Sequence, residues 1–404
     1  MGLKLTKEQA IATKKLKRWY IDPYEQVFKI AGYAGTGKTT IVFNLINELG
    51  LDPRTEVMFC TYVGKATLPL RKQHLLAKTL HSAFYKRVKE KVIGPDGEPV
   101  LMANGRAKTH MVFKLKEHID PNIKLFVFDE AAMIPSTMSD DAKSFAIPII
   151  ALGDTGQLEP VFGKSDLIRK PHAKLTQIMR QKEGDPIIFL SMLAREGKDI
   201  PIGKYGDNCY VVDETILKYP KIYTSPDIIL CGKNKTRENV NNIIRHDIKH
   251  YESEYPEYGD KMVCRKNNWD EEIDDIALIN GLFGYVVNID DSSYNGRELN
   301  IDFMPECLLN SWYEDIPIDY KYLNMSYGER KDYNSMYANG NLFEYGYAST
   351  VHLAQGSQYG YVLLLEEQLG SKAFNNKWMY TGITRAKETL VIVKKKRRNQ
   401  SYFF

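Results

Sequence analysis

Four segments of the 404-residue chain have patterns of apolar and polar positions that predict secondary structure. Glu25–Gly32 contains a short apolar run of strand character, and Thr40–Leu49 after it is apolar at helical spacing. Leu125–Phe128 and Ile147–Leu152 are continuous apolar runs, as expected of parallel strands covered on both faces. Strands followed by helices in this way predict an α/β fold built on parallel sheets.

The loop between the first strand and its helix has the sequence AGYAGTGKTT, from Ala31 to Thr40. The pattern GxxxxGKT is met by Gly32, Gly37, Lys38 and Thr39, in the strand–loop–helix context that confirms it. In such a loop the backbone N–H groups and the lysine bind phosphates, and the threonine hydroxyl binds Mg²⁺. The loop therefore predicts binding of ATP and Mg²⁺, although kinases, GTPases, motors and switches all share it.

Two acidic residues, Asp129 and Glu130, follow the apolar run Leu125–Phe128. A P-loop ATPase needs a carboxylate at the end of a neighbouring strand for the Mg²⁺ shell, and Asp129 meets that need. Glu130 is then placed to polarise the attacking water, which predicts hydrolysis because a kinase needs no second acid there. Asp154 and Gln157 follow the next apolar run, where ligands gather at the end of a parallel strand. A turn in which Asp154 caps a helix is the alternative.

The overall composition says less about the function of the protein than these motifs do. The net charge of +4 is too small to indicate nucleic-acid binding by itself. Basic runs at Lys14–Arg18, Tyr85–Lys91 and Lys394–Arg398 are either solvated surfaces or binding surfaces. Five cysteines without a CxxC pair indicate neither a zinc site nor a disulfide framework. No apolar run approaches the roughly 20 residues that cross a bilayer, so we expect a cytoplasmic protein with no membrane partner.

Seven segments in order resemble the motifs of superfamily 1 DNA helicases, most closely the Dda/RecD-like branch, which moves five-prime to three-prime. GYAGTGKTT, DEAAM and GDTGQLEP resemble motifs I, II and III, and LTQIMRQ (Leu175–Gln181) resembles a segment that carries an arginine finger. Cys231–Arg245, Ser349–Leu365 and Tyr380–Val393 resemble motifs IV, V and VI.

The resemblance implies two RecA-like P-loop domains, each with an insertion. The first RecA-like ATPase domain would take residues 1–81 and 121–180, with a β-hairpin insertion at 82–120. The second would take residues 181–262 and 346–404, with an SH3-like β-barrel insertion at 263–345. The turn sequence GPDG predicts the hairpin, which would be a strand-separating wedge or a plain surface hairpin. The Tyr-rich segment around 320–340 has no counterpart that we can place.

The resemblance also implies roles at the nucleotide. Gln9 would read the adenine edge, with a helix-surface glutamine as the alternative, and Gln157 would sense the γ-phosphate. Arg180 and Arg385 would be arginine fingers, with surface ion pairs as the alternative. The implied catalytic residues are Lys38, Asp129, Glu130, Gln157, Arg180 and Arg385, with Thr39 and Asp129 as the metal ligands. The implied nucleotide-binding residues are Gln9, Gly32, Gly35, Thr36, Gly37, Lys38, Thr39, Thr40 and Gly356.

A second set of residues is implied to bind single-stranded DNA through phosphates and sugars, without reading sequence. Each could instead be a cap or turn residue, or a structural histidine. The chain departs from the family pattern at Leu353, where a basic residue is usual, and in the segment FCTYVGKA, where APT is the commoner opening. The set is Thr61, Lys65, Thr79, His81, Asn234, Lys235, Thr350, His352 and Gln355.

The function predicted from these features is that of an ATP-dependent DNA helicase that translocates five-prime to three-prime on single-stranded DNA. It would unwind duplex DNA in replication or recombination, acting as a monomer at duplex/single-strand junctions beside a single-stranded-DNA-binding protein. The Dda-like order and compact size suggest a phage or mobile element. A translocase that displaces proteins without unwinding and a non-motor P-loop switch are the alternatives.

Overall fold

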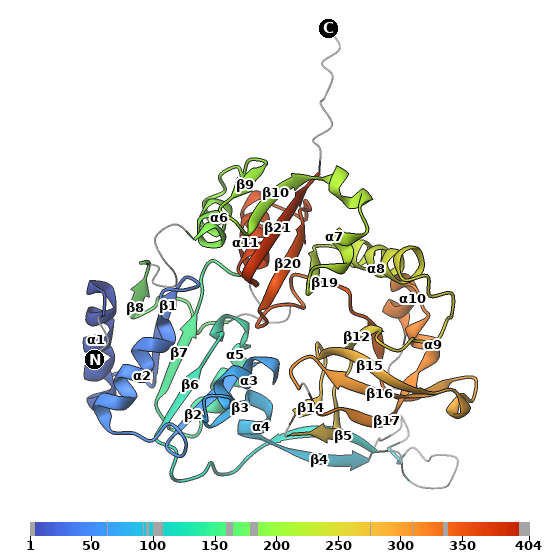
Figure 1. Cartoon of the computed structure of the whole chain (residues 1–404). Helices are drawn as coiled ribbons and strands as arrows, with labels where there is room; N and C mark the ends of the chain where they lie inside the picture. Colours follow the sequence, from blue (N-terminus) through green and yellow to red (C-terminus); the bar gives the residue numbers. More distant parts are fainter. Residues whose placement is uncertain are drawn as a thin grey trace. The chain divides into compact units, whose positions relative to one another are not determined.

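The computed structural model describes residues 5–62, 64–91, 93, 97–99, 107, 109–158, 165–177, 185–274, 276–308, 310–333 and 338–395 (Figure 1). The chain divides into two compact units. Unit 1 comprises Met1–Thr155 and Glu159–Arg180, and unit 2 comprises Gly156–Leu158 and Gln181–Phe404. Within the described ranges, no helix has the length and apolarity needed to cross a membrane.

Unit 1 is built on a six-stranded sheet in which every neighbouring pair is parallel. The two faces of the sheet carry separate apolar cores, because successive side chains of a strand point to opposite faces. The strands, in spatial order, are β3 (Ala77–Thr79), β2 (Val57–Thr61), β6 (Leu125–Phe128), β7 (Ile149–Gly153), β1 (Val27–Gly32) and β8 (Ala173–Leu175).

Helices α1 (Lys7–Ile21), α2 (Lys38–Leu49) and α3 (Leu68–Arg71) cover one face of this sheet, and α4 (Leu80–Phe84) and α5 (Ser136–Lys143) cover the other. Trp19 and Leu45 pack against Phe28 in the first core. Phe84 and Met138 pack with Phe126 in the second. Two short 3-10 helices, η1 (Gly64–Thr67) and η2 (Ala131–Met133), complete the unit.

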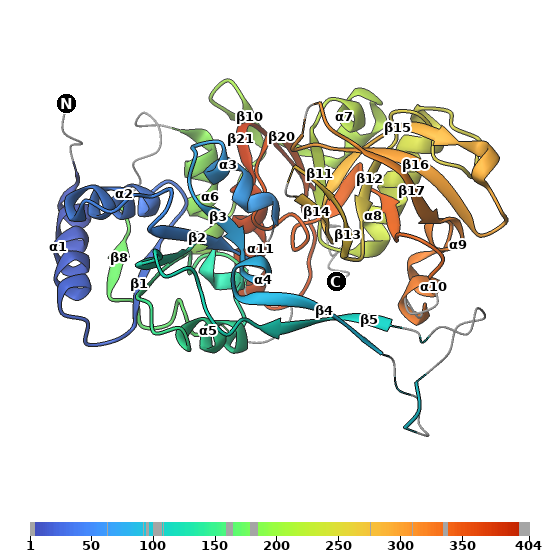
Figure 2. The same ribbon diagram turned by 90° about the horizontal axis from the view of Figure 1, so that it is seen from below.

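An antiparallel hairpin extends from unit 1 between α4 and β6. It consists of β4 (Tyr85–Lys91) and β5 (Thr109–Leu115), paired from Tyr85↔Leu115 to Lys91↔Thr109. The two strands run side by side as a ribbon (Figure 2). Beyond them Ile93 bridges Pro99, while residues 94–96 of the GPDG turn lie outside the described residues.

Unit 2 contains a second six-stranded sheet, in which all pairs are parallel except β10 with β9. Its order is β19 (Ala348–Thr350), β11 (Ile228–Cys231), β20 (Tyr359–Leu365), β21 (Ala386–Lys394), β10 (Cys209–Asp213) and β9 (Gly203–Tyr205). Its helical elements are α6 (Pro186–Glu196), η3 (Glu214–Lys218), α7 (Lys221–Thr224), α8 (Asn234–Asn242), the π-helix η4 (Ile243–Ile248) and α11 (Lys372–Ile383).

A five-stranded antiparallel sheet is inserted between η4 and β19. Its order is β17 (Tyr313–Asp319), β16 (Glu298–Pro305), β15 (Phe283–Asp290), β12 (Lys261–Cys264) and β18 (Phe343–Tyr345). A bridge between Ile318 and Asn341 links β17 to the residues just before β18, at the opposite edge of the sheet. The insertion also contains the hairpin β13 (Asn268–Ile273) and β14 (Ile276–Leu278), the 3-10 turn η5 (Asp291–Ser293), α9 (Tyr320–Leu323) and α10 (Tyr327–Asp332).

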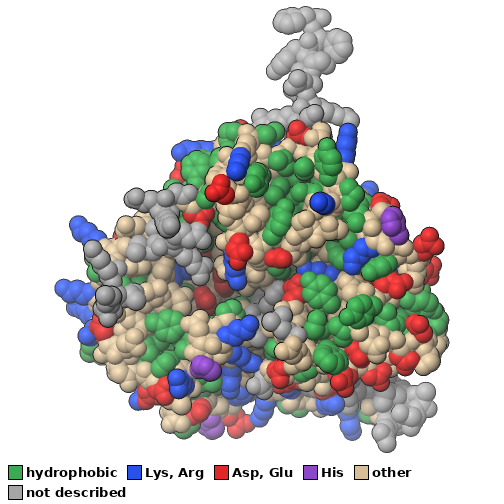
Figure 3. All heavy atoms as spheres, viewed as in Figure 1, with side chains coloured by type: hydrophobic (Ala, Val, Ile, Leu, Met, Phe, Trp, Pro, Cys, Tyr) green, Lys and Arg blue, Asp and Glu red, His purple; other side chains and the backbone are tan. Residues whose placement is uncertain are grey.

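The two parallel sheets confirm the predicted α/β class. Positive and negative side chains are interspersed over much of the face in Figure 3.

Candidate nucleotide and nucleic-acid sites

The predicted nucleotide-binding residues of unit 1 come together at one edge of its sheet. Strands β6, β7 and β1 are neighbours and run parallel, so their carboxyl ends lie at the same edge. The phosphate loop follows β1, Asp129 follows β6, and Asp154 follows β7. This is the edge at which open parallel sheets bind ligands.

The phosphate loop depends on glycine at three positions. Gly35 and Gly37 have φ of 77° and 78°, in the left-handed region that glycine adopts most readily. A Cβ atom on Gly32 would lie 2.6 Å from the Thr36 hydroxyl, so that position excludes any larger residue. Gly37 is also the residue from which α2 begins, so the N–H groups of the first turn of α2 open onto the loop.

Lys38 is held against the backbone of this loop. Its ammonium donates hydrogen bonds to the carbonyl oxygens of Gly32 at 2.7 Å and Tyr33 at 3.1 Å. Thr39 and Thr40 are half-buried in the first turn of α2. A cation, two hydroxyls and several N–H donors therefore gather within a few residues, which suits a polyphosphate.

Gln9 is buried rather than a helix-surface glutamine, with 3% of its surface exposed. Its side-chain oxygen Oε1 accepts a hydrogen bond at 3.0 Å from the backbone N–H of Thr6, the residue that caps α1. Its amide nitrogen donates to the carbonyl oxygen of Thr36 at 3.1 Å. Gln9 thus ties the start of α1 directly to the phosphate loop.

Glu8, which the sequence reasoning missed, fixes the chain just after β8. Its carboxylate accepts hydrogen bonds from the N–H of Thr176 at 2.7 Å, from the N–H of Gln177 at 3.0 Å and from the Thr176 hydroxyl at 2.6 Å. The bond from the Thr176 hydroxyl is the main cause that lowers the pKa of Glu8. Arg180 lies outside the described residues, and Gln177 is the last described residue before it.

Asp129 and Glu130 are both half-buried and are linked through the backbone. The N–H of Glu130 donates to Asp129 Oδ1 at 2.9 Å, and the N–H of Asp129 donates to the Cys60 carbonyl at 3.0 Å. Glu130 has φ of 50°, a left-handed conformation that costs energy for a residue with a side chain. Such strain is common at functional sites and fixes the direction in which a side chain leaves the backbone.

The segment after β7 passes from unit 1 into unit 2. Asp154 and Gln157 are both buried, and the residues Gly156–Leu158 belong to unit 2. There the N–H of Leu158 donates to the Thr381 hydroxyl at 3.1 Å, and Gln355 Nε2 donates to the Leu158 carbonyl at 3.1 Å. Gln355, predicted to bind DNA, is therefore in the interior of unit 2 with its amide on the protein backbone.

Arg385 is also buried, with 2% of its surface exposed. Its guanidinium donates to the carbonyl oxygens of Thr381 at 3.1 Å and Ser357 at 3.0 Å, and to the Thr384 hydroxyl at 3.3 Å. Thr381 therefore bonds both Leu158 and Arg385. The sequence gives no sign of this role for Thr381, because Leu158 is 223 residues away in the chain.

The unit 1 candidates for DNA contact lie at the carboxyl ends of β2 and β3. Thr61 is the last residue of β2 and is buried. Lys65 lies in η1, and its side chain is outside the described part of the structure. Thr79 caps α4 by accepting the N–H of Ser82 at 3.2 Å.

His81 belongs to an aromatic cluster at the base of the hairpin. The centroid of its ring lies 5.0 Å from that of Phe113, 5.9 Å from that of Tyr85 and 6.4 Å from that of Tyr62. Burial lowers the pKa of His81. An imidazole that is neutral at pH 7 among aromatic rings suits stacking on a base better than charge pairing with a phosphate.

Asn234 and Lys235 form the first turn of α8 in unit 2. Glu367, a further residue that the sequence reasoning missed, holds this helix end. Its carboxylate accepts the N–H of Gly232 at 2.6 Å, the N–H of Lys233 at 2.8 Å and the Thr236 hydroxyl at 2.7 Å. A carboxylate at a helix amino terminus is stabilising. The available signal was an acidic residue just after an apolar run, as for Asp129.

Thr350 ends β19, and its hydroxyl accepts the N–H of Leu353 at 3.3 Å. The ring of His352 stacks on Phe374 with centroids 6.0 Å apart and planes at 23°. Burial lowers the pKa of His352, so it too is a neutral ring. Gly356 has φ of 75° in the loop that follows.

The residues present fit Mg²⁺ as a partner of a bound nucleotide. Among the described residues, no group of three or more His, Cys, Asp or Glu side chains could hold a metal. Mg²⁺ in nucleotide sites commonly takes one or two protein oxygens and completes its shell with phosphates and water. The oxygens of Thr39 and Asp129 match that requirement.

Comparison with known proteins places the chain in a family. A model described as an AAA domain matches residues 4–214, more than half of the chain. The chain belongs to this AAA-domain family. A model described as a UvrD-like helicase C-terminal domain matches residues 345–393 of the same AAA-domain protein. The two models match different parts of the chain, and the second of them is a helicase domain.

This AAA-domain protein is similar to the ATP-dependent RecD2 DNA helicase of Deinococcus radiodurans, with 25% identity over 391 residues. That match covers 89% of the chain and 46% of the relative, so the chain spans about half the length of this curated relative. Two Pif1 structures share the fold. One, of two Pif1 helicases at forked double-stranded DNA, has TM-score 0.53 and 16% identity, covering 97% of this chain and 92% of that one. The other, Bacteroides Pif1 with ADP-AlF3 and single-stranded DNA, has TM-score 0.51, 15% identity and the same coverage, 97% and 92%.

Proposed function

We propose that the chain is an ATP-dependent DNA helicase that translocates on single-stranded DNA and unwinds duplex DNA. The observation that carries this proposal is the grouping of Lys38, Asp129 and Glu130 at one edge of the unit 1 sheet. A P-loop, a metal-binding carboxylate and a second acid in one place are the parts needed for nucleoside triphosphate hydrolysis. The relative RecD2 is named a DNA helicase, which supports the same activity here.

The residues of unit 1 have distinct tasks in hydrolysis. The N–H groups of the loop and Lys38 bind the phosphates, and Lys38 exchanges its bonds to Gly32 and Tyr33 for phosphate oxygens. Thr39 and Asp129 would hold Mg²⁺, which would neutralise negative charge on the phosphates. Glu130 accepts a hydrogen bond from the attacking water and so orients it in line with the leaving group.

The remaining predicted residues complete the nucleotide site. Gln9 contacts the adenine while its bond to Thr36 keeps it against the loop. Gln157 senses the γ-phosphate, and Arg180 and Arg385 stabilise the charge that develops during transfer. For Arg385 this requires its guanidinium to leave the carbonyl oxygens of Thr381 and Ser357.

DNA binding is proposed to combine phosphate contacts with base stacking. The hydroxyl, amide and ammonium groups of Thr79, Asn234, Lys235 and Thr350 suit phosphates and sugars. The neutral rings of His81 and His352 suit base faces. Neither kind of contact reads sequence, as a motor that moves along DNA requires.

Finer features of the function follow from the resemblance and are proposed with it. The β4–β5 hairpin acts as the strand-separating wedge. The five-stranded insertion is an SH3-like barrel, which the bridge between Ile318 and Asn341 supports because it links the edge strands. Movement is five-prime to three-prime, by a monomer in the cytoplasm, in replication or recombination of a phage or mobile element, beside a single-stranded-DNA-binding protein.

The test is strand separation on two partial duplexes, one with a five-prime and one with a three-prime single-stranded tail. ATP, Mg²⁺ and a fixed salt concentration are needed, because binding to DNA depends strongly on salt. We expect separation of the five-prime-tailed duplex only, and none with Lys38→Ala, which also loses hydrolysis. DNA-stimulated hydrolysis without separation of either duplex would instead indicate a translocase. Absence of any DNA stimulation would leave a P-loop switch.

A further inference from the structure

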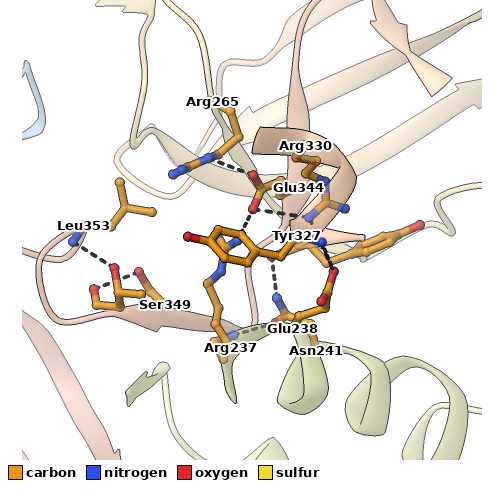
Figure 4. A network of polar contacts seen from close by, with 12 residues as sticks. Arg237, Glu238, Asn241, Arg265, Tyr327, Arg330, Glu344, Ser349 and Leu353 are labelled. Atoms are coloured by element: carbon orange, nitrogen blue, oxygen red, sulfur yellow. Dashed lines mark hydrogen bonds and ion pairs between the residues drawn. The ribbon is translucent and has the colours of Figure 1, made fainter. Parts of the chain in front are cut away.

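Neither the motifs nor the proposed function assign a role to the Tyr-rich segment, whose described residues are 320–333 and 338–340. It contains α9 and α10, which are only 4 and 6 residues long. Both helices are attached to α8 through a network of side chains around Glu344, the middle residue of β18 (Figure 4). Glu344 is buried, with 4% of its surface exposed.

Glu344 contacts side chains from four separate parts of unit 2. Its carboxylate pairs with Arg237 of α8 at 2.5 Å, with Arg265 after β12 at 3.0 Å and with Arg330 of α10 at 3.6 Å. The Tyr322 hydroxyl of α9 donates to the same carboxylate at 3.1 Å. One carboxylate therefore joins α8, the inserted sheet and both short helices.

Two further residues of α8 extend this attachment. Glu238 accepts the N–H of Tyr327, at the start of α10, at 2.8 Å. The side-chain amide of Asn241 donates to the Tyr345 carbonyl at 2.7 Å and accepts the N–H of Ala348 at 2.7 Å, which joins α8 to β18 and β19. The helix α8 is thus fixed to the insertion on one side and to β19 on the other.

Polar contacts dominate this attachment. Residues of α8 and of the α9–α10 segment line a cavity of about 370 Å³, and apart from Leu323, Met325 and Tyr345 its lining residues are polar or charged. Burial by itself would raise the pKa of Glu344, but the charges of Arg265, Arg237 and Arg330 outweigh it and hold that pKa below its usual range. Glu344 is therefore ionised at neutral pH. Removing its charge leaves three guanidinium groups that share this one carboxylate, a costly change for the buried Arg237.

The network lies next to both groups of DNA-contact candidates in unit 2. Asn234 and Lys235 are one turn before Arg237 and Glu238 on α8. Thr350 ends β19, which begins at Ala348, the partner of Asn241. Because Asn234 and Asn241 lie on one continuous helix, a shift of α8 relative to β19 changes the spacing between the two groups.

We propose that Glu344 is a positioning residue, which locks the Tyr-rich segment and the inserted sheet to α8 and so sets the spacing between Asn234–Lys235 and Thr350. The inference rests on the proposed function, because single-stranded DNA is the ligand whose binding it concerns. It assigns to the Tyr-rich segment the task of holding the proposed DNA-contact residues of unit 2 in place. The phosphate loop belongs to unit 1, so its function should not depend on Glu344.

The experiment compares Glu344→Gln with Glu314→Gln, an exposed glutamate on β17 of the same insertion. In each full-length variant we would measure the concentration of single-stranded DNA that half-maximally stimulates ATP hydrolysis, the unstimulated rate and the KM for ATP. We expect Glu344→Gln to raise the half-stimulating concentration about tenfold, the scale on which contacts within one network couple. The unstimulated rate and the KM should stay within about twofold, and Glu314→Gln should match the wild type.

Two milder tests do not depend on Glu344→Gln folding well. Tyr322→Phe removes only the hydroxyl that donates to Glu344 and should raise the half-stimulating concentration by a smaller factor. Arg330→Met should change this concentration less in the Glu344→Gln background than in the wild type, because the two residues act through one network.

Each outcome decides a different point. If the wild type is stimulated by DNA but neither Glu344→Gln nor Tyr322→Phe shifts the half-stimulating concentration, the inference is wrong and the proposed function stands. If Glu344→Gln lowers the unstimulated and stimulated rates equally at unchanged half-stimulating concentration, Glu344 has only a structural role. If DNA does not stimulate the wild type, the proposed function itself fails.

Discussion

Glu130 is the residue at which backbone conformation and proposed chemistry coincide. Its φ of 50° costs a residue with a Cβ atom about 1–2 kcal/mol relative to a right-handed conformation, and glycine avoids most of that cost. We expect Glu130→Gly to be more stable than Glu130→Gln, because glycine relieves the left-handed strain. The gain should not exceed about 1 kcal/mol, because glycine also loses more entropy on folding. Both variants should lose about 10²–10⁴-fold in hydrolysis, the usual contribution of a general base.

Urea unfolding and single-turnover hydrolysis test the two effects separately. The glutamine variant is the matched control, since it retains the side-chain volume and the backbone strain while losing the charge. Hydrolysis at the wild-type rate in either variant would remove Glu130 from the catalytic set. A glycine variant less stable than the glutamine variant would mean that the left-handed backbone carries no strain.

At this scale, a local pattern predicts residues whose role depends on their neighbours in sequence. Lys38 and Asp129 belong to short motifs that place them by spacing alone, and the structure brings both to one edge of the sheet. Glu367 carries the same local signal as Asp129, but its partner Gly232 is 135 residues away and could not be predicted from it. Thr381 carries no such signal for its bond to Leu158, which is 223 residues away. Only the folded chain brings those pairs within hydrogen-bonding distance.

The π-helix η4 and strand β12 lie where the chain enters the inserted sheet. Arg245 of η4 and Asp260, just before β12, are an ion pair with side chains 3% and 0% exposed, and their nearest atoms are 3.1 Å apart. Arg245 also lies over the ring of Tyr345, with its guanidinium carbon 4.1 Å from the centroid. Removing one partner of such a pair leaves the other charge buried, which costs about 3–5 kcal/mol.

We therefore expect Asp260→Asn to lower the free energy of unfolding by about 3–5 kcal/mol in chemical denaturation. Asp291→Asn, at an exposed aspartate of η5 in the same insertion, should change the free energy by less than about 0.5 kcal/mol. Equal stability of the two variants would contradict a stabilising role for the Arg245–Asp260 ion pair.

Elements with strong local signals were predictable, and elements held by distant contacts were not. The buried parallel strands β6 and β7 appear in the sequence as apolar runs, although β7 begins at Ile149 rather than Ile147. Pro148 lies between these residues and has no N–H to donate to a ladder. The helices α9 and α10 are too short to be stable alone and depend on their contacts with Glu344 and Glu238.

On the scale of the whole molecule, hydrolysis and strand separation are proposed to reside in different parts of the chain. Lys38, Asp129 and Glu130 lie at the sheet edge of unit 1, while the β4–β5 ribbon extends from that unit as a separate element (Figure 2). Basic residues such as Arg87 and Lys91 are exposed along the ribbon, which suits contact with DNA phosphates. A wedge of this kind takes no part in the chemistry.

Removing Gly94–Glu98, from the segment that joins β4 to β5, should therefore reduce strand separation much more than DNA-stimulated hydrolysis. A variant with these five residues replaced by a flexible Gly-Ser segment of equal length is the matched control for chain length, because Gly-Ser segments behave as random coils. If the segment Gly94–Glu98 must be stiff, the replacement should impair strand separation nearly as much as the deletion. If only its length matters, the replacement should restore separation. Equal loss of separation and hydrolysis in the deletion would contradict the wedge role, because both activities would then depend on the ribbon.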